Sequence, residues 1–381
     1  MSEVEERPRR LAELAALFLK LGTIGFGGPA AHIAMMEDEV VRRRGWISRD
    51  RFLDLLGATN LIPGPNSTEM AIHIGHARAG AAGLVVAGAC FILPATLIVG
   101  LCAHAYVKFG AMPQAQAILY GVKPVIIAIV VQALWRLGRT AMKTPFLAVA
   151  ALTAAAASLA GADELLVLLA AGLAAAFVRV RARPPAVSLA ALATAAPAAT
   201  AIPFSLGAMF LSFLKIGSVL FGSGYVLLAF LRADFVEHHA WLTEAQLLDA
   251  VAVGQFTPGP VFTTATFIGY VLGGAPGAAL ATAGIFLPAF LFVAASGPFV
   301  PKLRSSRLAG ALLDGVNAGS LGLMGAVAWQ LQRAAIYDLT TALLGLAGTA
   351  LLLVTRLNSA WLVAGGAVAG GIVKLLPPLP L

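Results

Sequence analysis

Charged side chains are scarce in this chain. Asp, Glu, Lys and Arg make up 12% of its 381 residues and 59% are hydrophobic, whereas a water-soluble domain carries roughly 25% charged residues. The mean hydropathy is +0.88. This composition excludes an ordinary soluble domain. It predicts an all-α polytopic membrane protein, in which each helical span needs about 20 apolar residues.

Cysteine is also rare, and the motifs of common enzymes are missing. Cys90 and Cys102 fall in one apolar run, where a helical rise separates them by roughly 18 Å, too far for a disulfide. The sequence contains no Gly-x-Ser-x-Gly, His-Glu-x-x-His or Walker A motif and no evident set of nucleophile, base and orienting residue. We therefore expect neither an enzyme nor a cofactor.

Metal and nucleic-acid ligands are not expected either. His73 and His76 have a spacing that could hold a metal on a helix, but no third ligand is nearby. The formal net charge of +8 could attract nucleic acid, yet the basic residues stand in short loops between apolar runs. Positive loops that stay on the cytoplasmic side of a membrane explain this placement more simply.

Proline and glycine, by contrast, form a repeated pattern. The stretch NLIPGPNST covers residues 60–68, and QFTPGPVFT covers residues 255–263, an offset of 195. Proline lacks the N–H that a helix needs and glycine readily ends one. Residues 63–65 and 258–260, the first and second PGP breaks, therefore predict interrupted or re-entrant helices.

Apolar runs around these breaks give the expected spans. The segment 11–34 should break at its glycine cluster, and residues 52–79 should form two short pieces, neither long enough to span a 30 Å core alone. Longer apolar runs follow near residues 82–107, 114–135, 145–160 and 164–178.

Much of the chain repeats itself. FLKLG at 18–22 corresponds to FLKIG at 213–217, and after one deleted residue the offset becomes 194, as in Pro94 and Pro288. Matching loops carry opposite charge balance, so the copies should insert upside down relative to each other. We expect a first repeat at 1–183, a linking segment at 184–208 that crosses the membrane, and a second, inverted repeat at 209–381.

Inverted repeats with discontinuous helices are typical of secondary transporters, whose substrate site lies near the midplane of the membrane. Broken helices offer backbone N–H groups to an anion, although the same small residues can simply allow close helix packing. Each copy has a Gly-rich break, at 26–29 and 221–224, besides its PGP break. The predicted anion-binding residues at the four breaks are Gly27, Gly28, Pro63, Gly64, Pro65, Asn66, Ser67, Thr68, Gly222, Ser223, Gly224, Pro258, Gly259, Pro260 and Thr263.

Charged residues inside or beside apolar runs add further candidates. Lys20 and Lys215 occupy matching positions and either draw an anion inward or extend toward the interface. Glu69, Asp54 and Asp249 are candidates for proton coupling, because a carboxylate in low dielectric can exchange protons near neutral pH. The alternatives are a helix N-terminal carboxylate for Glu69 and a structural role for the aspartate pair.

These motifs together resemble the chromate ion transporter family in its long, two-domain form. The resemblance rests on FLKLGTIGFGGP, the region of Trp46, NLIPGPNST, FGSGY and QFTPGP. It implies a multi-pass protein of the bacterial cytoplasmic membrane that exports chromate with the proton gradient, and functional importance for Glu37, Arg42, Asp54 and Arg78.

Several alternatives stay open beside chromate export. Sulfate has the same shape and charge, so import or exchange of sulfate or another oxyanion is one alternative, and an anion channel is another. The expected partners are chromate, sulfate as a second anion, protons and the lipid bilayer, with no nucleic acid. A homodimer is left open.

Overall fold

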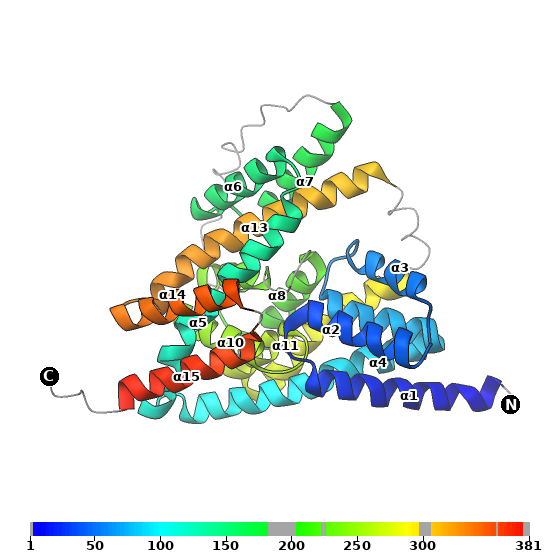
Figure 1. The fold of residues 1–381 in the computed structure, drawn as a ribbon, viewed down its shortest axis with the longest axis horizontal. Helices are drawn as coiled ribbons and strands as arrows, with labels where there is room; N and C mark the ends of the chain where they lie inside the picture. Colours follow the sequence, from blue (N-terminus) through cyan, green and yellow to red (C-terminus); the bar gives the residue numbers. More distant parts are fainter. Residues whose placement is uncertain are drawn as a thin grey trace.

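The computed structural model describes residues 3–181, 203–221, 224, 226–296, 306–355 and 357–375, and in these residues all regular structure is helical (Figure 1). Its first part comprises α1 (Glu3–Ile24), α2 (Gly28–Glu37), the π-helix η1 (Asp38–Arg43), α3 (Arg49–Thr59), α4 (Asn66–Phe109), α5 (Pro113–Ala141), α6 (Pro145–Leu159) and α7 (Glu164–Arg181). Its second part comprises α8 (Leu206–Val219), α9 (Leu227–Leu231), the π-helix η3 (Arg232–His238), α10 (Glu244–Phe256), the 3₁₀ turn η4 (Val261–Thr263), α11 (Thr264–Ser296), α13 (Arg307–Ala335), α14 (Leu339–Val354) and α15 (Ser359–Leu375).

Helices of membrane-spanning length confirm the predicted fold class. The helices α4, α5 and α13, and α11 with the short turn before it, are long and apolar enough to cross a membrane. Large apolar side chains such as Leu101, Leu152 and Leu346 are about 70% exposed on the outer surface, which in a bilayer faces lipid. The chain is an all-α polytopic membrane protein.

Breaks in the helices fall where the Pro and Gly pattern predicts them. The helix α1 ends at Ile24 and α2 begins at Gly28, on either side of the glycine cluster. The helix α3 has 11 residues, and α4 has an arm at 66–78 before a kink. At 1.5 Å per residue, these pieces reach only about 17 to 20 Å, which confirms two short segments around the first PGP break.

The kink in α4 recurs in α11. Ala79 and Gly80 leave helical geometry with φ of −145° and 62°. Gly273 and Gly274 do so with φ of −140° and 62°, at an offset of 273 − 79 = 194. The same tight turn thus folds each helix into two arms, and its positive φ favours glycine at the second position.

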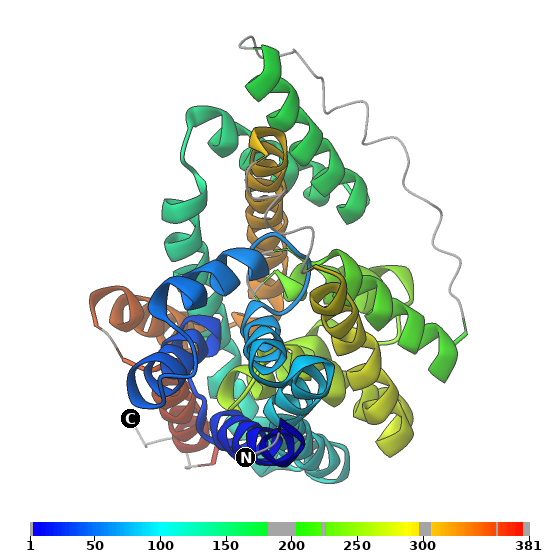
Figure 2. The same cartoon turned by 90° about the vertical axis from the view of Figure 1, so that its right-hand side faces the viewer.

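Helices of one copy pack on helices of the other. Within each copy α1 lies on α4 and α8 lies on α11, and α4 and α11 pack together. However, α6 and α7 pack on α13, while α14 and α15 pack on α5. Figure 2 shows α6 and α7 in teal and green on the two sides of α13. The outer helix pair of each half of the chain therefore packs on a helix of the other half.

The predicted linking segment at 184–208 lies mostly outside the described residues, which resume at 203. Its crossing of the membrane and the repeat boundaries therefore stay predictions.

Candidate functional site

Backbone hydrogen bonds join the four helix breaks in two pairs, each pair linking the first half of the chain to the second. The Gly64 N–H of the first PGP break donates to the Leu220 carbonyl oxygen at 2.8 Å, next to the second Gly-rich break. The Gly259 N–H donates to the Gly25 carbonyl oxygen at 2.8 Å, next to the first Gly-rich break. The two hydrogen bonds are equivalent in the repeat. The donors Gly64 and Gly259 are 195 residues apart, and so are the acceptors Gly25 and Leu220. Each PGP break is thus tied to the Gly-rich break of the other copy.

Only glycine fits the centre of each PGP break. Gly64 and Gly259 have φ of 141° and 91°, values that side-chain-bearing residues rarely adopt. A Cβ on Gly259 would lie 2.5 Å from the Ala95 Cβ and 3.2 Å from the Gly22 carbonyl oxygen. A Cβ on Gly64 would collide with the carboxylate of Glu69. Close backbone approach between the copies depends on these two positions.

Asparagine side chains brace the first PGP break. The Asn66 amide donates to Asn60 Oδ1 at 3.0 Å, and the Asn60 amide donates to the Leu56 carbonyl oxygen at 3.1 Å. Pro65 precedes the first residue of α4. Asn66, predicted to contact an anion, therefore links the end of α3 to the start of α4 in this conformation.

Buried polar atoms without partners mark the first turn of α4. Ser67, Thr68 and Glu69 are 2%, 0% and 0% exposed. Within the described part of the chain, neither Glu69 carboxylate oxygen nor the Thr68 hydroxyl has a hydrogen-bond partner. Buried polar groups are normally paired, and an unpaired buried charge is costly. A proton on the Glu69 carboxyl would remove the buried charge without needing a partner from the surrounding side chains.

The second PGP break is satisfied internally and closed. The hydroxyls of Thr263 and Thr264 donate to the Pro260 and Val261 carbonyl oxygens, both at 2.8 Å. The cavity beside it has a volume of only ≈ 10 Å³, about the minimum that holds one water. Its lining includes Val130, Gly224, Gln255, Val261 and Thr264. This cavity is too small to hold a tetrahedral oxyanion.

The Gly-rich breaks are described in part. Gly27 and Gly28, with φ of 104° and 77°, turn the chain into the first residues of α2. Gly224 lines the small cavity, whereas Gly222 and Ser223 lie outside the described residues. His32, which the sequence did not single out, is buried with Nε2 at 3.0 Å from the Gly25 carbonyl oxygen.

Both candidate lysines carry a carboxylate partner. Lys20 Nζ lies 2.7 Å from Glu39 Oε1, and Lys215 Nζ lies 2.5 Å from Asp234 Oδ1. The two acids also match at the repeat offset, since 234 − 39 = 195. The hydrogen bond from Lys20, followed by that from Arg44, lowers the pKa of Glu39. In this conformation the Lys20 ammonium group is paired with Glu39 and the Lys215 ammonium group with Asp234.

The matched aspartates lie in different environments. Asp54 is exposed on α3, whereas Asp249 is 3% exposed on α10. Asp249 forms an ion pair with Lys123 Nζ at 3.2 Å and accepts a hydrogen bond from the Tyr106 hydroxyl at 2.9 Å. Sequence reasoning missed Lys123, although a lone lysine in the run 114–135 carried the same signal as Lys20. The pair joins α4 and α5 of the first copy to α10 of the second.

Breaking this pair should destabilise the fold. Removal of one partner from a buried ion pair leaves an uncompensated charge, at a cost of about 3–5 kcal/mol. We therefore expect Lys123→Met to lower the thermal unfolding midpoint in detergent by more than Lys123→Met combined with Asp249→Asn. Asp54→Asn, at the exposed counterpart, is the matched control and should change little. Additive losses in the double variant would show that the two groups are not coupled.

No group of three metal-ligating side chains is present in the described residues, where His73 and His76 stand without a third ligand.

Comparison with known proteins identifies close relatives. The sequence profile of the family described as Chromate transporter matches residues 12–194 and 207–371. The chain is 34% identical to the chromate transport protein of Cupriavidus metallidurans over 94% of this chain and 92% of that protein. It is also 34% identical to the chromate transport protein of Pseudomonas aeruginosa, over 98% and 94% respectively. A probable chromate transport protein of Synechococcus elongatus is 31% identical, over 88% of each chain. No solved structure matches the chain.

Proposed function

The chain belongs to the chromate transporter family, and we propose that it is a secondary active transporter that exports chromate across the bacterial cytoplasmic membrane. The relatives from Cupriavidus metallidurans and Pseudomonas aeruginosa are chromate transport proteins by name. The observation that supports a transport site within this chain is the pairing of each PGP break with the Gly-rich break of the other half by a backbone hydrogen bond.

The two copies are proposed to insert in opposite orientations. Their reciprocal packing supports a two-fold relation, and the arginine-rich loop at 42–51 corresponds to a mainly acidic stretch in the second copy. With the axis in the membrane plane, the centre of the breaks lies near the midplane, where inverted-repeat transporters bind substrate.

The anion and the opposite copy compete for the same donors. The N–H groups of Gly64 and Gly259 are both bound to carbonyl oxygens of the other copy in the closed conformation. When the copies move apart, these N–H groups and the N-terminal end of α4 become available to an oxyanion. Hydrogen bonds to the substrate therefore replace the two that break on opening, and this exchange stabilises the open state only when the anion is bound.

Glu69 couples this site to protons. Its carboxyl lies against Gly64, buried and without a hydrogen-bond partner. The ionised form repels a dianion in the same centre, and the protonated form can donate a hydrogen bond to it. The proton and the anion therefore bind together. One proton with one dianion carries a net single negative charge outward, which an inside-negative membrane potential favours.

Uptake into everted membrane vesicles tests the proposal. We expect saturable uptake of radiolabelled chromate that increases with an imposed lumen-positive potential, with sulfate and molybdate as competing anions. Vesicles from cells without the protein are the control. If chromate does not move while another anion does, the substrate assignment is wrong. A current that rises linearly with concentration would instead identify an anion channel.

A further inference from the structure

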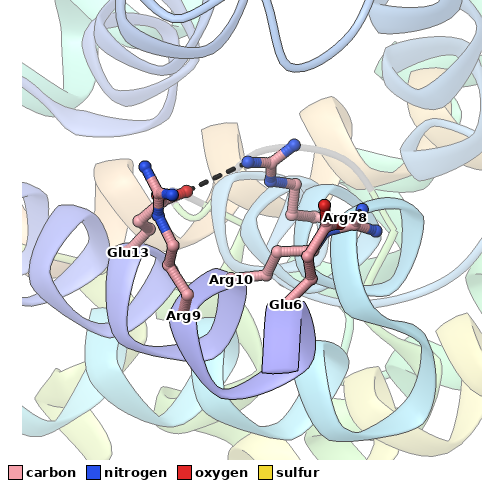
Figure 3. Close-up of polar contacts among 5 residues, drawn as sticks. All are labelled: Glu6, Arg9, Arg10, Glu13 and Arg78. Atoms are coloured by element: carbon pink, nitrogen blue, oxygen red, sulfur yellow. Dashed lines mark hydrogen bonds and ion pairs between the residues drawn. The ribbon is translucent and has the colours of Figure 1, made fainter. Parts of the chain in front are cut away.

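Another cavity, lined by charged side chains, lies between the first turns of α1 and the kink of α4, away from the helix breaks. It has a volume of ≈ 300 Å³ and is lined by Glu6, Arg7, Arg10, Arg78, Ala79 and Gly80. An adjoining hollow of ≈ 170 Å³ shares Glu6, Arg10 and Arg78 and adds Arg9 and Glu13. Figure 3 shows Glu6, Arg9, Arg10 and Glu13 of α1 beside Arg78 of α4, with the contact between Arg78 and Glu13 as a dashed line. We call this space the basic cleft.

Positive charge is in excess in the basic cleft. Arg78 Nη2 lies 3.0 Å from Glu13 Oε2, Arg9 Nε lies 3.2 Å from Glu13 Oε1, and Arg10 pairs with Glu6. Among the side chains that the structure describes, which begin at Glu6, four arginines and two glutamates line the cleft, a formal excess of 4 − 2 = +2. Arg7 is exposed and forms no ion pair with any side chain described from Glu6 onward. The cleft can therefore accept an anion without first losing all its internal pairs.

Neighbouring groups place the cleft at the membrane surface. The Arg78 guanidinium lies 4.8 Å from the ring centroid of Trp46, and the Arg44 guanidinium lies 5.1 Å from the same ring. Tryptophan is enriched at the membrane–water interface, and clustered arginines mark the cytoplasmic side. The basic cleft therefore opens at the depth of the lipid headgroups, in the leaflet that carries anionic lipids.

The kink of α11 does not repeat the arginine of the kink of α4. Leu272 stands where Arg78 would be repeated, since 272 − 78 = 194. A Cβ on Gly273, beside the matching kink, would lie 2.6 Å from Leu206 and 3.5 Å from Phe204, so apolar side chains fill that place. At the first kink, a Cβ on Gly80 would meet no atom within 4 Å, and a Cβ on its counterpart Gly274 would meet only Pro276, at 4.0 Å. In the described residues the two kinks therefore differ in the arginine at position 78 and in the apolar side chains packed on Gly273.

We propose that the basic cleft binds the phosphate group of an anionic phospholipid from the adjacent leaflet. Guanidinium groups match phosphate in geometry and charge, and basic pockets beside membrane helices are suited to such headgroups. The bound lipid would bridge the start of α1 and the turn of α4. Lipid binding at the basic cleft does not involve the transported anion. It can therefore be tested independently of chromate transport.

Lipid retention by the purified full-length protein tests this proposal. We expect the protein to keep phosphatidylglycerol through detergent washing, measured by native mass spectrometry, and to unfold at a higher temperature when that lipid is added. Arg7→Gln with Arg10→Gln should weaken this binding at least about tenfold, because each surface arginine contributes appreciably to attraction of anionic lipid. The single variant Arg7→Gln, which breaks no ion pair with the side chains described from Glu6 onward, should show a smaller loss in the same direction.

The control variants distinguish a specific lipid-binding site from non-specific attraction of anionic lipid to basic side chains. Arg136→Gln with Arg139→Gln removes the same charge from the exposed C-terminal end of α5 and should leave lipid retention unchanged. An equal loss in this control would overturn the proposal. It would also be overturned if phosphatidylcholine were retained equally well, or if inorganic phosphate alone raised the unfolding temperature as much as the lipid.

Discussion

Glu69→Gln should abolish the coupling of chromate transport to protons while preserving anion binding. The glutamine has nearly the same shape and cannot ionise. For a carboxylate about 5 Å from a dianion, the repulsion is about 7 kcal/mol at an effective dielectric constant of about 20. Because this exceeds the roughly 1.4 kcal/mol that corresponds to a tenfold change in affinity, the protonation state of Glu69 decides whether the centre accepts chromate.

The measurement combines two fluxes in proteoliposomes. In the wild type, chromate transport should decrease as the pH rises and should be accompanied by proton movement, reported by a trapped pH-sensitive dye. In Glu69→Gln, proton movement should disappear and transport should become independent of pH. Sulfate, which stays a dianion over this range, separates protonation of the protein from protonation of chromate. Proton movement retained in the variant would assign coupling to another group.

The control for this experiment is Asp54→Asn. Asp54 is the exposed carboxylate of α3, whereas Glu69 is fully buried in the first turn of α4. We expect Asp54→Asn to keep pH-dependent transport, because an exposed carboxylate is screened by solvent from an anion at the breaks. The contrast between the two carboxylates would show that burial, and not acidity alone, confers coupling.

Gly259→Ala should reduce chromate transport at least tenfold while the protein still inserts into the membrane. The added Cβ would lie 2.5 Å from the Ala95 Cβ on a backbone with φ of 91°. Strain of this kind costs about 1–2 kcal/mol for the backbone and about 1–3 kcal/mol for overpacking. The Gly259 N–H must then move away from the Gly25 carbonyl oxygen, and the closed state loses one of its two reciprocal hydrogen bonds.

Two further variants isolate the cause of this loss. Ala95→Gly in the Gly259→Ala background removes the steric contact but leaves the strained φ, so transport should recover in part. Gly100→Ala, in α4 where an added Cβ meets no atom within 4 Å, is the control and should transport normally. Vesicle uptake is compared at equal amounts of inserted protein. Full activity of Gly259→Ala would contradict a close approach of the two copies during transport.

Local chemistry made the helix breaks predictable from the sequence. Proline and glycine act through their own backbone, so the breaks after Ile24 and Thr59 follow from residues within a few positions. The kink at Ala79 and Gly80 was not predicted, although the run 82–107 was placed just after it. An isolated glycine in an apolar stretch looks the same whether it allows helix packing or reverses the chain.

Partners of the charged residues could not be derived in the same way. Lys20 and Lys215 were recognised as unusual, but Glu39 and Asp234 became their partners only through the folding of α2 and α9 with their π-helices. Lys123 and Asp249 are 126 residues apart, since 249 − 123 = 126, and meet because the two copies pack together. Sequence shows that a buried charge needs a partner, and only the tertiary fold says which one.

The exchanged packing of the outer helices also sets the order of biogenesis. The helices α6 and α7 rest on α13, which begins at Arg307, 126 residues after α7 ends at Arg181. At a synthesis rate of about 5–20 residues per second, α13 begins to be made about 6–25 seconds after α7 is complete. During that interval they lie in the lipid with their packing faces uncovered. The first half therefore reaches its final structure only after the second half has left the ribosome.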